Sequence, residues 1–89
     1  MKFVWDPEKA EANLRKHGIS FSEATEVFDD PNSLDKFDDI HSVDERRYNT
    51  IGLTKRGILF VVHTEETADS TRIISARKAS GYEKKQYFG

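Results

Sequence analysis

The segment RIISARK at residues 72–78 combines the composition of a β-strand with three fixed positive charges. Its two isoleucines favour a strand, and Ser75 and Ala76 are small enough to leave one face open. Cations around such an open centre suit a bound anion, because they donate strong hydrogen bonds to phosphate. A solvated sheet edge would have the same composition. The cations are Arg72, Arg77 and Lys78.

Strand alternation predicts which side chains of this segment share a face. We expect Ile74 and Ala76 to face a core, while the residues between them and beside them face an open side. Arg72 and Lys78 then lie near the two ends of the strand. The residues expected on the open side are Ile73, Ser75 and Arg77.

The chain has three histidines and no cysteine. His63 lies near the end of an expected strand, where a pKa near neutrality would allow proton transfer, although a surface histidine without a catalytic role is more frequent. His17 precedes an expected helix end, and His41 falls in an expected loop. The three histidines lack metal-ligand spacing and no glycine-rich phosphate loop is present, so we predict no metal site and no cofactor.

The charges are unevenly distributed, although the formal net charge is only −2. Residues 29–45 carry seven acids against one lysine, whereas residues 46–64 carry four cations and no acid. A local field matters more than the net charge for binding a polyanion, although chance segregation explains the pattern equally well. Cations beside aromatic rings are the pairing that binds single-stranded RNA. The candidate rings are Tyr48, Tyr82, Tyr87 and Phe88.

The length and the sequence periods predict one domain, residues 1–89, with an α+β fold. A short N-terminal strand is followed by a helix with Asp6 as its N-cap and Gly18 as its C-cap. Capping-box spacing predicts two further helices, after Ser20 and after Ser80. Between them we expect a three- to four-stranded antiparallel meander, with the helices packed on one face of the sheet. The expected strands are 2–5, 33–37, 46–54, 57–64 and 71–78, with loops at 40–45 and 65–70.

The N-terminus lacks the apolar core of a signal peptide, and no apolar run is long enough to span a membrane. We therefore expect a cytoplasmic protein without a membrane partner.

Four segments resemble the BrnT family of type II toxin–antitoxin toxins, and together they cover nearly the whole chain. The opening WD, N and KHG elements and the motif RIISARKA are the specific parts of this resemblance. The segments are FVWDPEKAEANLRKHGISFSEATEVFDDP, DERRYNTIG, LFVVHT and RIISARKASGYEKKQY.

The resemblance implies a compact RelE-like ribonuclease fold, RNA cleavage that halts translation, and neutralisation by a BrnA-type antitoxin. The complex would bind operator DNA only through the antitoxin and so regulate its own operon. The resemblance leaves open the RNA target, the need for the ribosome, and a toxin homodimer within the complex. Chemically, such a ribonuclease needs no metal, because positioned cations can stabilise the charge that develops on the phosphate.

Carried over position by position, the family motifs cover Glu45, Arg47, Arg72, Ser75, Arg77, Lys78, Glu83 and Tyr87, whereas His63, Lys55 and Arg56 are candidates from their chemistry and position alone. Arg72 and Arg77 are expected to contact the phosphate, and Glu45 and Glu83 to support the site. The proton-transfer candidates are His63, Lys78 and Tyr87. The RNA-binding candidates are Arg47, Lys55, Arg56 and Ser75.

One position departs from the family pattern. Many relatives have Thr-Glu-Arg after the central strand, whereas this chain has Thr64-Glu65-Glu66. We expect Glu66→Arg to raise RNA affinity or cleavage, because it replaces a charge that repels phosphate with one that attracts it. Lys55 or Arg56 would otherwise take over the missing contact.

Two other functions remain open from the residues alone. The same cations could hold nucleic acid without cleaving it, or the chain could be a protein-interaction module. Cyclic-phosphate products formed in EDTA would distinguish a ribonuclease from both.

Overall fold

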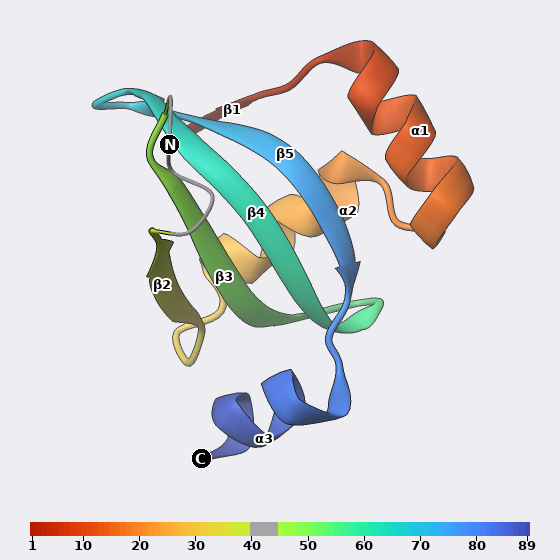
Figure 1. Cartoon of the computed structure of the whole chain (residues 1–89), viewed down its shortest axis with the longest axis vertical. Coiled ribbons are helices and arrows are strands. Elements are labelled where there is room, and N and C mark those ends of the chain that lie inside the picture. Colours follow the sequence, from red (N-terminus) through yellow and green to blue (C-terminus); the bar gives the residue numbers. More distant parts are fainter. Residues whose placement is uncertain (40–44) are drawn as a thin grey trace.

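The computed structural model describes residues 1–39 and 45–89, so His41 and most of the expected loop at 40–45 lie outside the described part of the chain. Figure 1 shows a twisted sheet with helices around it. In chain order the elements are β1 (Lys2–Val4), α1 (Pro7–His17), α2 (Phe21–Ala24), the 3-10 helix η1 (Thr25–Asp29), β2 (Leu34–Asp38), β3 (Arg47–Thr54), β4 (Gly57–Thr67), β5 (Ser70–Lys78) and α3 (Gly81–Phe88).

Within the described residues, five strands form one sheet in the order β1-β5-β4-β3-β2. Strands β2 to β5 are an antiparallel meander, and β1 joins parallel to β5 at its outer edge. This confirms the predicted α+β fold, with its N-terminal strand, two helices, meander and final helix. Strand β4 extends to Thr67 and β5 begins at Ser70, so the turn between them is shorter than the loop expected at 65–70.

Helices α1 and α2 and the 3-10 helix η1 cover one face of the sheet, which we call the helical face. Asp6 accepts a hydrogen bond from the Glu8 amide, and Gly18 ends α1 with a φ of 72°. Gly52 allows η1 to approach the sheet, because a Cβ at this position would lie 2.8 Å from the Cβ of Val27. The core on this face comprises Ile19, Phe21, Ala24, Val27, Leu59, Val61, Ile73 and Ala76.

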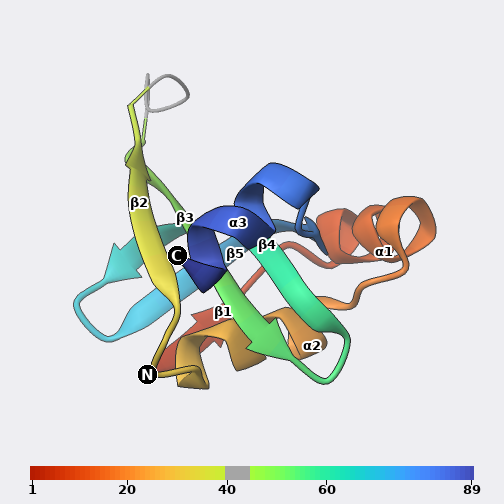
Figure 2. The same ribbon diagram turned by 90° about the horizontal axis from the view of Figure 1, so that it is seen from below.

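Helix α3 packs on the other face of the sheet, which differs from the expectation that all helices share one face. Figure 2 shows α3 and α2 on opposite sides of the strands. The Tyr87 ring of α3 packs near Leu34 and Phe60 against a smaller cluster, so the C-terminal helix closes only one end of this face. The buried members of that cluster are Ile51, Ile58 and Ala79.

A β-bulge in β5 corrects the predicted orientation of its isoleucines. Val62 pairs with Ser75, whereas His63 pairs with Ile73, so Ile74 is an extra residue without a register partner. Ile73 is 1% exposed in the helical-face core. The expectation that Ile73 faces the open side was therefore wrong, because a bulge interrupts strict alternation. Ile74 is only partly buried, beside residues of α1.

Asn13 connects α1 to the free edge of β5. Strand β1 pairs with β5 only as far as Arg72, so among the residues that the structure describes the backbone of Ala76 has no strand partner on that side. The Asn13 amide donates to the Ala76 carbonyl at 2.8 Å and accepts from the Ala76 amide at 3.1 Å. This contact gives a structural reason for the asparagine in the opening motif.

None of the helices in the described ranges has the length and apolar character needed to cross a membrane.

Candidate functional site

The sheet face opposite α1 and α2, where α3 does not cover it, is here called the open face. Antiparallel register partners share a face. Arg47, Thr64 and Arg72 form one row across β3, β4 and β5. Two further rows are Asn49, Val62 and Ser75, and then Ile51, Phe60 and Arg77.

The bulge at Ile74 is what brings both arginines of β5 to this face. Arg72 and Arg77 are five positions apart, so strict alternation would place them on opposite faces. The extra residue shifts the alternation by one position, so both arginines face the same side. In the register, Arg72 aligns with Thr64 and Arg77 with Phe60. The predicted sharing of one face by Ser75 and Arg77 is confirmed, and Arg47 joins them from β3.

At the α3 end of the open face, Arg77 is held in a defined geometry. Its two terminal nitrogens each donate to one oxygen of Glu83 at 2.8 Å, and its guanidinium lies 4.2 Å from the centre of the Phe60 ring. The hydrogen bonds raise the pKa of Arg77 and lower the pKa of Glu83, so both groups stay ionised. Glu83 also accepts from the Ser80 amide, which makes the arginine contact part of the α3 cap.

A hollow of about 400 Å³ lies beside Arg77 on the open face. Its volume falls within the range of small-ligand sites, which is about 300–1,000 Å³. Apolar side chains form part of its lining, and charged groups stand at both ends. The lining residues are Asp38, Arg47, Asn49, Phe60, Val62, Ser75 and Arg77.

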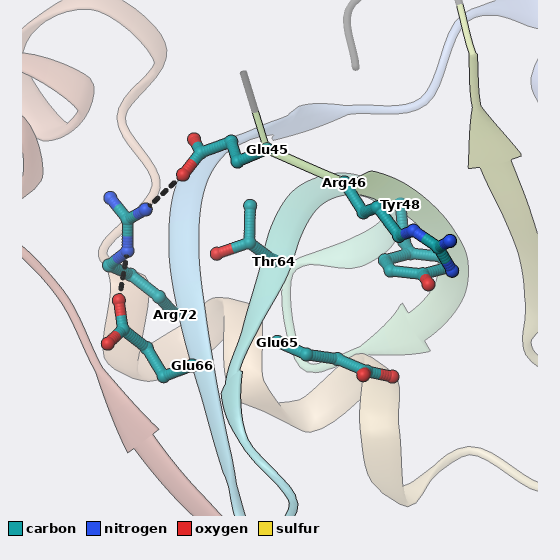
Figure 3. Close-up of a pocket in the computed structure, with 7 residues that line it drawn as sticks. All are labelled: Glu45, Arg46, Tyr48, Thr64, Glu65, Glu66 and Arg72. Carbon is teal, nitrogen blue, oxygen red and sulfur yellow. Dashed lines mark hydrogen bonds and ion pairs between the residues drawn. The ribbon is translucent and has the colours of Figure 1, made fainter. Parts of the chain in front are cut away.

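At the other end of the open face, Arg72 lies between two carboxylates (Figure 3). Its Nη2 is 2.5 Å from Glu45 Oε2, and its Nε is 2.6 Å from Glu66 Oε1. The second oxygen of Glu45 lies 3.7 Å from Arg47, so Glu45 contacts two arginines. Glu45, Glu66 and Arg72 border a second hollow of about 360 Å³. Arg72 therefore has carboxylates on two sides in the free protein.

Three predicted cations lie away from this face. Lys78 pairs in register with Leu59, which is buried under the helices, so its side chain starts from the opposite face. Lys55 and Arg56 occupy the β3–β4 turn. Lys55 Nζ lies 3.9 Å from Glu26 and Arg56 Nη1 lies 3.2 Å from Glu23, so both contact the helical layer rather than the open face.

His63 belongs to the helical-face core and is 8% exposed. Burial lowers its pKa to about 4, so the imidazole is neutral at pH 7. Thr50 donates its hydroxyl proton to Asp35 and lies 2.7 Å from His63 Nε2. Because Thr50 has only one proton to donate, Nε2 carries the imidazole proton. The strand continues for four residues beyond His63, so the expected position near its end was wrong.

Tyr87 is directed toward Asp30 rather than toward the arginines. Its hydroxyl donates to Asp30 Oδ2 at 2.5 Å, which raises the pKa of Tyr87 and lowers that of Asp30. Tyr82 and Phe88 are largely exposed on α3, and Tyr48 stacks on His63. Among residues 1–39 and 45–89, no group of three or more histidine, cysteine, aspartate or glutamate side chains is placed to hold a metal ion.

Two residues of the open face were missed in the sequence. Phe60 supports Arg77, and Asn49 lines the hollow between the arginines. The alternation of β4 already places Phe60 opposite Leu59. Pairing β4 with β5 so that Phe60 lies beside Arg77 would have identified this contact. Nothing in the local sequence marks Asn49.

Two comparisons with known proteins give matches. A family model described as the ribonuclease toxin, BrnT, of type II toxin–antitoxin systems matches residues 5–83. The 1.1 Å crystal structure of the Brucella abortus ribonuclease toxin BrnT is similar to this chain, with a TM-score of 0.68 and 29% sequence identity. The match covers 90% of this chain and 97% of that one. A search of curated proteins gives no match.

Proposed function

The chain belongs to the BrnT family of ribonuclease toxins of type II toxin–antitoxin systems, and we propose that it cleaves RNA on its open face without a metal ion. One observation carries this proposal. The bulge in β5 gathers Arg72, Ser75 and Arg77 on one face with Arg47, and a hollow of about 400 Å³ lies on that face.

Arginines at both ends of the hollow give the face two places to hold phosphate. Arg77 is prepositioned by Glu83 and Phe60, while Arg47 stands across the hollow and Ser75 between them adds a hydroxyl donor. Positioned donors stabilise the charge that develops on the phosphoryl oxygens, and one such donor contributes about a hundredfold in rate. Arg72 extends the cationic row beyond Arg47.

The reaction we propose is attack of a ribose 2′-oxygen on the adjacent phosphorus. The new bond joins O2′ to phosphorus and the bond from phosphorus to O5′ breaks, leaving a 2′,3′-cyclic phosphate and a 5′-hydroxyl. Glu45 is the carboxylate we assign to accept the 2′-hydroxyl proton, because it is partly exposed between Arg47 and Arg72. Water supplies the proton to O5′. His63 and Lys78 belong to the opposite face and the Tyr87 hydroxyl is bonded to Asp30, so none of the three is assigned to proton transfer.

Cleavage of RNA would inhibit translation, and a small BrnA-type antitoxin would neutralise it by covering the open face. Complementary charge would speed association, and buried apolar contacts would set the dissociation rate. The antitoxin would carry the complex to operator DNA. Charge reversal at Arg47 or Arg77 should therefore weaken the complex, as measured by its dissociation constant.

The test is cleavage of labelled RNA by the purified protein in EDTA, with analysis of the product ends. We expect cyclic-phosphate and 5′-hydroxyl ends, and a loss of about a hundredfold for Arg77→Ala. Lys78→Ala is the matched control, because it removes the neighbouring cation from the other face of the same strand.

Equal losses for the two variants would contradict the assignment of the open face. Binding of RNA without any cleavage, by a protein whose folding is verified, would favour a non-catalytic nucleic-acid-binding module. Antitoxin binding that leaves cleavage of free RNA intact would contradict coverage of the site.

A further inference from the structure

Glu66 occupies a second β-bulge, at the far end of β4. Glu65 pairs with Thr71 and Thr67 pairs with Ser70, so Glu66 has no register partner. A bulge re-aims the side chain of its extra residue. Here the Glu66 carboxylate lies 2.6 Å from Nε of Arg72 on the neighbouring strand, as an ion pair in which the Nε–H is not aligned for a hydrogen bond (Figure 3).

The contact balances the charge at this end of the open face. Arg47 and Arg72 contribute two positive charges, and Glu45 and Glu66 contribute two negative charges, so the group of four is neutral. Without Glu66 the same group would carry one positive charge. Glu66 therefore lowers the positive charge that this end of the face offers to a phosphate, while Arg46 and Glu65, which line the same hollow, offset each other.

Stability alone does not require this contact. The side chains of Arg72 and Glu66 are 28% and 42% exposed, and ion pairs with that exposure contribute little to stability. Arg72 already has a carboxylate partner in Glu45 at 2.5 Å. The larger effect of Glu66 is on the electrostatic potential that an approaching RNA meets.

We propose that Glu66 lowers the affinity of the site for RNA, because its carboxylate occupies the edge of Arg72 that an RNA phosphate would otherwise bind. The proposal rests on the function proposed above, because it names what limits RNA binding at that same face. Glu66 acts through Arg72 and is a positioning residue rather than a catalytic one.

The test compares Glu66→Gln with the unmodified protein in binding a fully 2′-O-methylated RNA, which lacks the attacking hydroxyl and reports affinity independently of cleavage. At low salt we expect up to about fivefold tighter binding, the range that a half-exposed ion pair supports. The dependence of log affinity on log salt should steepen by about 0.7, as expected for one additional phosphate contact to a single strand.

Two controls separate the specific contact from a change in overall charge. Glu65→Gln makes the same charge change one residue away, where the carboxylate points away from Arg72 (Figure 3), and should change affinity less than twofold. In an Arg72→Ala background, Glu66→Gln should have no further effect, because the partner through which it acts is gone.

Unchanged RNA affinity for Glu66→Gln, or the same gain in affinity with Glu65→Gln, would overturn this role of Glu66. So would loss of thermal stability without a gain in affinity, which would show that Glu66 only fastens the β4–β5 turn. Failure of the proposed ribonuclease function looks different: no RNA is cleaved by any variant, while the affinity of the 2′-O-methylated RNA still responds to Glu66.

Discussion

The two ends of the open face contain the same ion pair between arginine and glutamate in two different settings. Arg77 pairs with Glu83, a helix-capping residue that is only 13% exposed, and lies on the Phe60 ring. Arg72 pairs with two more exposed carboxylates at strand ends and has no ring beneath it among the described contacts. The first pair attaches α3 to the sheet, whereas the second mainly sets the local charge.

Arg72 and Arg77 share the open face only because of the bulge at Ile74. The largest expected effect is therefore the difference between substitutions at the two isoleucines of the bulge. Ile73→Asp should destabilise the protein by at least about 4 kcal/mol, because it places an unpaired charge in the core. Ile74→Asp should cost much less, since Ile74 is only partly buried beside α1. Urea denaturation of both variants measures the difference. The reverse order would place Arg72 and Arg77 on opposite faces and remove the basis of the comparison.

The open face also contrasts with the helical face, where His63 makes stability depend on pH. Its pKa is lowered from 6.5 to about 4, so between these values the unfolded chain binds more protons than the folded one. Stability should therefore fall as the pH drops from 6.5 to 4, by up to about 3 kcal/mol from this residue.

Urea unfolding at pH 7 and pH 4.5, for the unmodified protein and for His63→Gln, measures this contribution. The variant should lose less stability between the two pH values, because the remaining acid dependence comes from carboxylates such as Glu83, whose lowered pKa acts at more acidic pH. An identical pH dependence in the two proteins would mean that His63 is not buried in its neutral form.

The two arginines should differ in their contribution to folding. Arg77→Ala should lower the unfolding free energy by about 1–2 kcal/mol, since it removes a bidentate ion pair and a ring contact and leaves Glu83 partly buried. Arg72→Ala should cost less than about 1 kcal/mol, because its partners are more exposed. Thermal unfolding of both variants provides the comparison, and equal losses would show that the two settings are equivalent.

The smallest expected effect concerns position 66, where the family resemblance implies an arginine. Glu66→Arg should raise RNA affinity at low salt, and the gain should shrink at high salt as phosphate attraction is screened. The structure adds a reason, since the substitution also removes the carboxylate from Arg72. Affinity equal to that of Glu66→Gln would indicate that the released Arg72, rather than the new arginine, accounts for the gain.

The sequence was sufficient for the order of elements, because their signals are local. Asp6, Gly18 and the two serine–glutamate capping boxes mark helix ends, and each forms the predicted contact. The orientation of β5 was not predictable, because a bulge depends on pairing with a strand elsewhere in the chain. The same is true of Glu66, whose partner became visible only with the register of β4 and β5.

The sequence predicted several residues of the candidate site correctly, but not how all of them are arranged. Ser75 and Arg77 share the expected face, and Glu83 contacts Arg77, as a helix following directly on the strand allows. Lys55 and Arg56 were expected near the RNA as replacements for the arginine missing at position 66. They contact acids of α2 and η1 instead, and those long-range ion pairs have no signature in the local sequence.

The central claim is that RNA binds the open face, and nuclear magnetic resonance titration with 2′-O-methylated RNA tests it most directly. We predict that the perturbed signals belong to Arg47, Ser75 and Arg77, with smaller changes at Arg72 while Glu66 is present. Perturbations centred on Lys55 and Arg56 at the β3–β4 turn, or on Lys78 on the opposite face, would contradict the claim.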